Sequence, residues 1–237
     1  MTSHDRIVPL KRFDPAKSKY SADSVSADKQ RLSPLARVKK RALDLVVASC
    51  ALVFFAPIMV LISLALLIQD GRPIFFKHKR IGMGGQPFQC WKFRTMAKDS
   101  EQRLRQLLEN SDACRQQWLT NQKLDQDPRA HPTGALLRKS GLDELPQFVN
   151  VIQGDMSVVG PRPIVLDELA RYGKDAKYYF ALRPGITGLW QVSRRSDTSY
   201  DERVEFDVRY CQTWTITGDI AIMARTVAVL LTTKGCR

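Results

Sequence analysis

The chain has 237 residues, five cysteines, three histidines and a formal net charge of +13. The cysteines are odd in number and form no C-x-x-C pair, and the histidines are scattered, which argues against a disulfide scaffold and a zinc site. The positive charge indicates an anionic partner, such as nucleic acid, an anionic lipid surface or a phosphorylated substrate.

The N-terminal segment is polar and basic. Residues 1–41 contain eleven Lys and Arg but four Asp and Glu, a net charge of +7. Because this composition leaves little to bury, residues 1–34 are predicted to form a disordered basic arm. The apolar run that follows begins too far from the N-terminus, and is too long, for a secretory signal. We therefore expect it to remain attached.

The most informative feature is an apolar run of 24 residues without a charge, Leu45 to Ile68, with Pro57 near its middle. A spanning helix needs ~20 apolar residues, so this run is long enough to cross a bilayer. Both flanks are basic, however, and basic flanks tend to stay cytoplasmic. Residues 35–70 are therefore predicted to be membrane-associated, either crossing with a tolerated proline or bending at Pro57 and re-entering the same face. A membrane segment favours lipid or phosphorylated partners over nucleic acid.

Residues 71–237 are predicted to form one cytoplasmic domain of mixed α/β class. Residues 74–81 and 87–95 are β-prone runs joined by GMGGQ, which predicts a hairpin. Residues 101–124 carry apolar side chains at helical spacing, which predicts an amphipathic helix that contacts either the domain core or the bilayer interface. Shorter helices are predicted at 134–139, 164–172 and 219–231.

Candidate catalytic and binding residues are most concentrated around Asp143 and Glu144, two adjacent carboxylates followed by Pro146. At a helix start two such side chains diverge by about 100°, so one could face a substrate phosphorus while the other binds a metal. The free N–H groups and the dipole of a helix start suit phosphates. Taken alone, the same pattern also describes a solvated helix cap.

Further polar residues on stiff backbone flank this pair. Arg138 precedes it, and Asp155, Arg162 and Arg183 follow in loops that contain proline and glycine. Several arginines presented in this way suit a diphosphate, with Arg138 and Arg162 as the candidates that neutralise its charge. Pro161-Arg162-Pro163 could instead be a rigid connector with an exposed arginine.

Lys92 and Arg94 lie in the predicted hairpin, next to the membrane segment. There they could bind a lipid phosphate or simply pair with surface acids. A carboxylate and a diphosphate repel each other, so a divalent cation is expected to neutralise charge before attack. Mg²⁺, with Mn²⁺ as an alternative, prefers one or two carboxylates together with phosphate oxygens. Asp143 and Glu144 are its predicted ligands.

Five ordered blocks resemble the bacterial sugar transferases, the monotopic phosphoglycosyltransferases that act on polyprenyl phosphate. The blocks are the basic-flanked membrane segment, KFRTM (Lys92 to Met96), LRKSGLDELPQ (Leu137 to Gln147), GDMSVVGPRP (Gly154 to Pro163) and RPGITGLWQV (Arg183 to Val192). The similarity is greatest to the short members that transfer galactose 1-phosphate or glucose 1-phosphate at the start of exopolysaccharide synthesis. It implies a re-entrant helix on the cytoplasmic face of the bacterial inner membrane. The family commonly has serine before the bending proline, where this chain has Ala56.

The resemblance also implies a two-step reaction. Asp143 attacks a UDP-sugar, UMP leaves, and the hexose phosphate passes to undecaprenyl phosphate, while Glu144 helps to hold Mg²⁺ and assists proton movement. Two alternatives remain: a membrane-bound nucleotide-sugar phosphodiesterase that uses the same carboxylates with water as acceptor, and a non-enzymatic basic scaffold at the membrane. The sequence does not indicate which sugar is transferred or whether the protein is a homo-oligomer.

Overall fold

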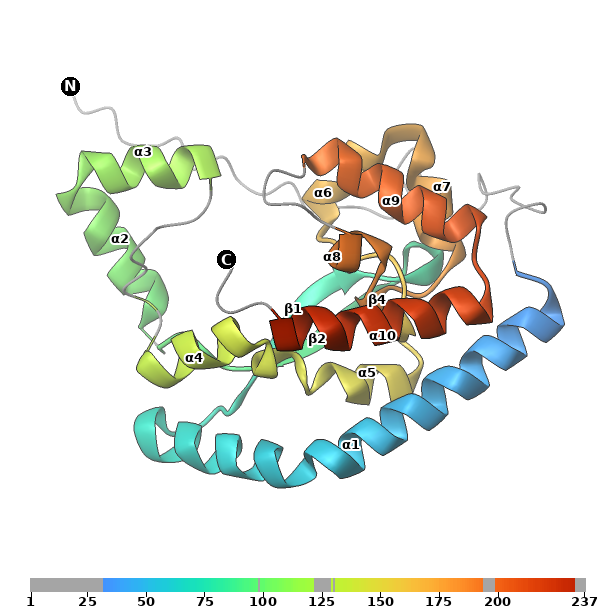
Figure 1. The fold of residues 1–237 in the computed structure, drawn as a ribbon. Helices are drawn as coiled ribbons and strands as arrows, with labels where there is room; N and C mark the ends of the chain where they lie inside the picture. The colour runs from blue at the N-terminus through green and yellow to red at the C-terminus, as the bar shows by residue number, and fades with distance from the viewer. Residues whose placement is uncertain (1–31, 98, 122–128, 130, 194–198, 233–237) are drawn as a thin grey trace.

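The computed structural model describes residues 32–97, 99–121, 129, 131–193 and 199–232 (Figure 1). One long helix, α1, runs along the base of a small domain that contains both helices and strands, as predicted. The elements in chain order are α1 (Pro34–Asp70), β1 (Phe75–Ile81), η2 (Met83–Gly85), β2 (Pro87–Phe93), α2 (Ser100–Asn110), α3 (Asp112–Asn121), α4 (Pro132–Ser140), η3 (Leu142–Glu144), α5 (Gln147–Gln153), β3 (Ser157–Val159), α6 (Leu166–Tyr172), η4 (Gly173–Asp175), α7 (Ala176–Ala181), β4 (Gly185–Thr187), α8 (Leu189–Ser193), α9 (Tyr200–Gln212) and α10 (Ile216–Thr232).

Helix α1 begins with local capping and continues through its internal proline. The Ser33 hydroxyl accepts a hydrogen bond from the Ala36 N–H at 3.2 Å, and Pro34 occupies the first turn, both typical of a helix start. The helix ends at Gly71, whose φ of 63° favours glycine. Pro57 lies inside one continuous helix, whose ribbon is curved (Figure 1). Proline removes one hydrogen bond while the surrounding turns keep theirs.

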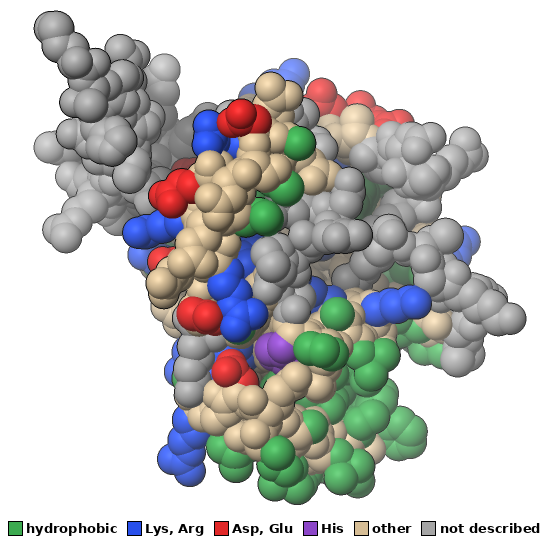
Figure 2. Space-filling model, turned by 90° about the vertical axis from the view of Figure 1, so that its left-hand side faces the viewer, with side chains coloured by type: hydrophobic (Ala, Val, Ile, Leu, Met, Phe, Trp, Pro, Cys, Tyr) green, Lys and Arg blue, Asp and Glu red, His purple; other side chains and the backbone are tan. Residues whose placement is uncertain are grey.

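The outward face of α1 is apolar and exposed. The helix is long and apolar enough to cross a membrane, and only 11% of its most apolar window is buried, unlike the core helix of a soluble protein. Val53, Phe54 and Ile68 are each more than three-quarters exposed. Figure 2 shows hydrophobic side chains gathered at the base of the molecule, with charged side chains above them. So large an exposed apolar surface fits a helix that lies in lipid.

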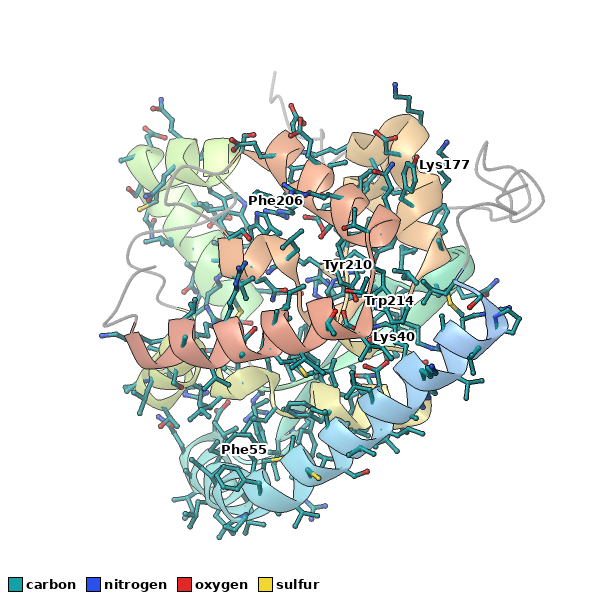
Figure 3. All side chains as sticks on the ribbon, turned by 45° about the vertical axis from the view of Figure 1, so that its right-hand side comes forward. Lys40, Phe55, Lys177, Phe206, Tyr210 and Trp214 are labelled. Carbon is teal, nitrogen blue, oxygen red and sulfur yellow. The ribbon has the colours of Figure 1, made fainter. Side chains whose placement is uncertain are left out.

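A buried polar network attaches the start of α1 to the C-terminal helix α10. Lys40 Nζ donates to Asp219 Oδ2 at 2.8 Å and to the Val159 carbonyl at 2.9 Å. Tyr210 and Trp214 donate to the two Asp219 carboxylate oxygens at 2.8 and 3.0 Å, so both oxygens accept hydrogen bonds. Figure 3 labels Lys40, Tyr210 and Trp214 of this network. Both Lys40 and Asp219 are buried, and each therefore depends on the other to offset its desolvation.

The predicted hairpin is confirmed. Strands β1 and β2 pair antiparallel with His78 opposite Cys90, and Ile81 bridges to Ile164 in the segment after β3. A second sheet, the parallel pair β3 and β4, was not predicted. Each of its strands has three residues, too few to show an alternating pattern.

Close backbone packing holds β3 and β4 together. Gly160 donates to the Thr187 carbonyl and Gly185 donates to the Pro161 carbonyl, both at 2.9 Å. A Cβ on Gly160 would lie 2.7 Å from the Gly185 nitrogen, a separation that real Cβ atoms essentially never show. Glycine is therefore required where the end of β3 packs against the start of β4, two residues before Arg162.

The helix predicted at 101–124 is two helices, α2 and α3, separated at the extended Ser111. Residues 122–124 lie outside the described residues. The predicted alternative of contact with the core is wrong for α2, because none of its residues is buried and the ribbon stands away from the domain (Figure 1). Its leucines are only half-buried. The helices predicted at 134–139, 164–172 and 219–231 are confirmed as α4, α6 and α10.

A hydrophobic cluster joins α1 to the segment that contains Asp143 and Glu144. Ile62 and Leu66 of α1 pack with Phe93, Leu137 and Leu145. Phe93 ends strand β2, and Leu145 directly follows the two adjacent carboxylates. The candidate site is thereby held immediately above the apolar helix.

Candidate active site

Asp143 and Glu144 lie on the short 3-10 helix η3, between α4 and α5. Helix α4 ends at Gly141, whose φ of 73° reverses the chain in a left-handed conformation suited to glycine. Pro146 then precedes the first turn of α5. The two carboxylates are thus presented at the start of a helix, as predicted, on backbone that glycine and proline restrict.

Lys92 joins the two carboxylates. Its Nζ lies 2.5 Å from Glu144 Oε1 and 3.9 Å from Asp143 Oδ2. The Asp143 side chain is 10% exposed, whereas that of Glu144 is 33% exposed, so Glu144 is the more accessible acid. Both acids therefore converge on one cationic position, which Lys92 reaches from strand β2.

Asn150 aligns β2 with α5 and so places Lys92 opposite the acids. Its Oδ1 accepts from the Trp91 N–H at 2.9 Å, and its Nδ2 donates to the Gln89 carbonyl at 2.7 Å. Asn150 is fully buried. A buried amide with both ends paired to the strand fixes the register of the strand against the helix.

A pocket adjoins this group and contains about 310 Å³ of empty space, part of it open to solvent. Its walls come from β1, β2, η3, α5, β4, α8 and the segment after β3, and they comprise Arg80, Cys90, Lys92, Glu144, Gln147, Arg162, Pro163, Gly185, Ile186 and Gln191. Three of these side chains are cationic and one is anionic. The excess of positive charge suits an anionic ligand such as a diphosphate.

Arg80 and Arg162, which line the pocket, are each restrained by contacts with neighbouring residues. Arg80 donates to the Pro163 carbonyl at 3.2 Å and lies 3.6 Å from Glu168, which also lies 3.7 Å from Arg203. Burial lowers the pKa of Arg80, which nevertheless starts from a value far above neutral. The Arg162 guanidinium lies 5.6 Å from the centroid of the Trp190 ring, within cation–π range. These contacts reduce the freedom of both arginines before substrate binds.

Cys90 also lines the pocket, and burial raises its pKa to about 11. It therefore remains a neutral thiol near pH 7 and contributes volume, not charge.

Arg138 and Arg94 do not line the pocket. Arg138, on α4, donates from Nε to the Thr95 hydroxyl at 2.8 Å. Arg94 is buried at the end of α1, where it donates to the Asp70 and Gly71 carbonyls at 3.1 and 2.9 Å and pairs with the Asp70 carboxylate. A cation at a helix C-terminus compensates the helix dipole, so the contacts of Arg94 are those of a structural residue.

Asp155 and Arg183 lie on another side of α5. Asp155 accepts from the Asn150 amide at 3.1 Å, and Arg183 donates to the Gly154 carbonyl at 2.6 Å. Burial, and next the charge of Arg41, lower the pKa of Arg183. The structure thus gives both residues contacts at the turn between α5 and β3, away from the pocket lining.

The structure therefore brings Lys92, Glu144 and Arg162 together in the pocket lining and places Asp143 beside Lys92, although Asp143 itself does not line the pocket. It also adds lining residues that the sequence reasoning missed. Gln147 could have been noticed, because it lies in the same sequence block as the two acids. The sequence around Arg80 and Gln191 contains no motif that points to the pocket, because their place in its lining depends on the packing of distant segments.

Within the described residues no group of three or more His, Cys, Asp and Glu side chains could hold a metal by itself. Mg²⁺ does not require such a group, because it binds through one or two carboxylates together with substrate phosphates and water. The convergence of Asp143 and Glu144 on one cation fits that ligand set.

Comparison with known proteins supports a family assignment. The family described as "Bacterial sugar transferase" matches residues 35–233. Exopolysaccharide production protein ExoY of Sinorhizobium fredii is 42% identical over 204 residues, which cover 86% of this chain and 90% of that protein.

Two longer relatives match through less than half of their length. The undecaprenyl-phosphate galactose phosphotransferase of Salmonella typhimurium is 46% identical over 84% of this chain and 42% of its own. The UDP-glucose:undecaprenyl-phosphate glucose-1-phosphate transferase of Escherichia coli is 36% identical over 83% of this chain and 41% of its own. Because the family match extends over most of the chain, this protein belongs to the bacterial sugar transferase family.

Proposed function

We propose that the protein transfers a hexose 1-phosphate, of galactose or glucose, from a UDP-sugar to undecaprenyl phosphate, forming a lipid-diphosphate sugar and UMP. The observation that carries this proposal is the convergence of Asp143 and Glu144 on Lys92, beside a cationic pocket that Lys92 and Glu144 line and next to an exposed apolar helix. Two relatives are named for undecaprenyl phosphate as acceptor, and ExoY for exopolysaccharide production. The reaction would be the first membrane step of such a synthesis.

In the first step, an Asp143 carboxylate oxygen attacks the phosphorus that carries the hexose. A bond forms between that oxygen and phosphorus, and the bond from phosphorus to the oxygen of UMP breaks. Lys92, which lies 3.9 Å from Asp143, and Arg162 of the pocket lining would offset the charge that builds up on the phosphate oxygens. The products are an aspartyl phosphosugar and UMP, and no proton needs to move.

In the second step, an oxygen of undecaprenyl phosphate attacks the same phosphorus. The bond from phosphorus to Asp143 breaks, and the free carboxylate is restored. A covalent intermediate divides one difficult displacement into two easier ones. It also allows UMP to leave before the lipid phosphate enters a pocket of limited size.

The protein needs a divalent cation in this proposal, and Asp143 and Glu144 would hold it with the substrate phosphates. Mg²⁺ or Mn²⁺ would supply charge neutralisation for an anionic nucleophile that approaches a diphosphate. Lys92 already contacts both acids and would keep them close together.

The active site would face the cytoplasm of the bacterial inner membrane, with α1 as a re-entrant helix bent at Pro57. In support, basic residues flank the apolar run Leu45 to Ile68 on both sides, and the site packs on the C-terminal half of α1. The test is side-specific labelling of a Ser3→Cys variant whose native cysteines are removed. Labelling only from the cytoplasm is expected, and periplasmic labelling would establish a crossing helix.

The activity itself is tested with purified protein in detergent, polyprenyl phosphate and a panel of UDP-sugars. UMP release and a lipid-linked sugar phosphate are expected together, with one hexose preferred. Continuous UMP release without polyprenyl phosphate would instead indicate a hydrolase. Absence of turnover with every UDP-sugar would refute the proposed transfer.

A further inference from the structure

The pocket lining includes two carboxamide side chains, Gln147 and Gln191, to which the proposed reaction steps assign no role. They come from α5 and α8, lie more than forty positions apart in the chain, and line the pocket together with Ile186. Carboxamides are neutral and both donate and accept hydrogen bonds. They differ in this from Arg80, Lys92 and Arg162, which suit phosphate.

The Gln191 amide has a defined orientation. Its Nε2 donates to the Ile186 carbonyl at 3.0 Å, while Oε1 is buried and has no hydrogen-bond partner within the described part of the chain. Exchange of the oxygen and nitrogen would turn two acceptors toward each other, so the Ile186 carbonyl fixes the orientation. The unpartnered atom is therefore an acceptor.

Gln147 lines the same pocket, and its residue is only 2% exposed. It follows Glu144 by three residues and so lies close to the reacting acids. Buried polar groups are nearly always paired, and an unpaired one costs roughly 1–3 kcal/mol. The unpaired Gln191 Oε1, in a pocket that a second carboxamide also lines, indicates a ligand that pairs with it.

The ligand group must donate a hydrogen bond to Gln191, which excludes an ionised phosphate oxygen. A hexose hydroxyl can both donate and accept, and therefore matches both amides. A uracil ring is a poorer match, because no aromatic side chain in the described part of the chain lines the pocket to stack on it. In an in-line displacement, moreover, the departing UMP lies opposite Asp143, whereas the hexose stays on the attacked phosphorus.

We propose that Gln147 and Gln191 bind hydroxyl groups of the transferred hexose and thereby select the sugar. This inference rests on the proposed function. A site built to pair with a hydroxyl rejects an analogue that lacks it, because the protein group is then buried without a partner. The pair is consequently a specificity element, distinct from the cations that hold the diphosphate.

The test compares Gln191→Met and Gln147→Met with wild-type protein, using the preferred UDP-hexose and analogues that each lack one hydroxyl. Gln153→Met is the matched control, since Gln153 lies exposed on the same helix as Gln147. In wild-type protein and in the control, loss of the recognised hydroxyl should lower kcat/KM by about tenfold to a hundredfold. In each pocket variant, loss of its hydroxyl should cost less than about threefold.

A nucleotide readout separates the hexose from the base. Binding of UMP should be unchanged in both pocket variants, and an equal loss of UMP and UDP-hexose affinity would assign the amides to the nucleotide and overturn the inference. The same sensitivity to every missing hydroxyl in wild type and variants would also overturn it.

Calorimetric binding of UDP-hexose and UDP keeps the test independent of turnover. If wild-type protein binds UDP-hexose but transfers nothing, the proposed function fails while the binding comparison still decides the role of the amides. Thermal melting identifies a misfolded variant, and the other glutamine variant then carries the comparison.

Discussion

Lys92 Nζ lies 2.5 Å from Glu144 Oε1, and this contact joins strand β2 of the hairpin to the 3-10 turn that carries both acids. The same ammonium is 3.9 Å from Asp143. One cation therefore keeps two neighbouring carboxylates together in a partly buried site, where their mutual repulsion would otherwise separate them. The predictions below begin with this contact.

Replacing Lys92 should impair catalysis more than stability. Lys92→Met removes the cation shared by Glu144 and Asp143, and we expect kcat/KM to fall roughly 100-fold or more, as for loss of an electrostatic group in an active site. Lys79→Met is the control, because Lys79 is exposed on the adjacent strand and carries the same charge. Steady-state UMP release measures both, and equal effects of the two changes would contradict a role for the contact.

Asp143→Asn should abolish the covalent intermediate, since the amide keeps the shape but loses the nucleophile. Incubation with a UDP-sugar labelled in the phosphate next to the hexose, without lipid acceptor, should leave label on denatured wild-type protein but not on this variant. Glu144→Gln should be slowed yet still labelled. Labelling of Asp143→Asn to the wild-type level would assign the nucleophile to another residue.

Activity should require a divalent cation. We expect EDTA to abolish UMP release and Mg²⁺ or Mn²⁺ to restore it, because Asp143 and Glu144 converge on a single cationic position. Glu144→Gln should need a higher Mg²⁺ concentration for half-maximal rate. Full activity in chelator would exclude the metal-assisted route.

Breaking the buried ion pair between α1 and α10 should destabilise the fold. Lys40→Met leaves Asp219 buried with only Tyr210 and Trp214 as donors, at a cost of about 3–5 kcal/mol. Adding Asp219→Asn should recover part of this loss, since the amide carries no charge. Lys39→Met, on the exposed neighbouring residue, is the control. Thermal melting in detergent measures all three, and equal melting temperatures for Lys40→Met and Lys39→Met would refute the role of the pair.

Asp207 should make stability depend on pH. It is buried on α9 and accepts a hydrogen bond from the Tyr172 hydroxyl at 2.7 Å, and burial raises its pKa to about 7. Between about pH 4, its value in the unfolded chain, and pH 7, the folded state holds a proton that the unfolded state has lost. The free energy of unfolding therefore falls as pH rises through this window, by roughly 4 kcal/mol at most.

The Asp207→Asn variant checks this assignment, because an amide does not titrate. Melting in detergent at pH 5 and pH 8 should show that the melting temperature falls less with rising pH in the variant than in the wild-type protein. His78 and His131, whose pKa values are lowered chiefly by burial, contribute with the opposite sign in both proteins and cancel in the comparison. An unchanged difference would assign the pH dependence to other groups.

Local features of the chain were predictable from sequence. The apolar run around Pro57, the hairpin, and the helix start at Asp143 and Glu144 depend on composition, alternation and turn residues within short windows. The same kind of window places Lys92 in the hairpin that follows the apolar run directly. Its contact with Glu144, fifty-two residues away, required the structure.

Only the tertiary structure decided which polar residues share the pocket. Asp155 and Arg183 follow the acids in proline- and glycine-containing loops, yet they hold the turn after α5, while Arg80 and Gln191 enter the pocket from β1 and α8. Spacing along the chain cannot distinguish these outcomes, because each depends on how β3 and β4 pair and how Asn150 aligns β2. The sequence by itself therefore determined the long apolar helix and the adjacent pair of acids at a helix start, and long-range packing determined which residues line the pocket beside them.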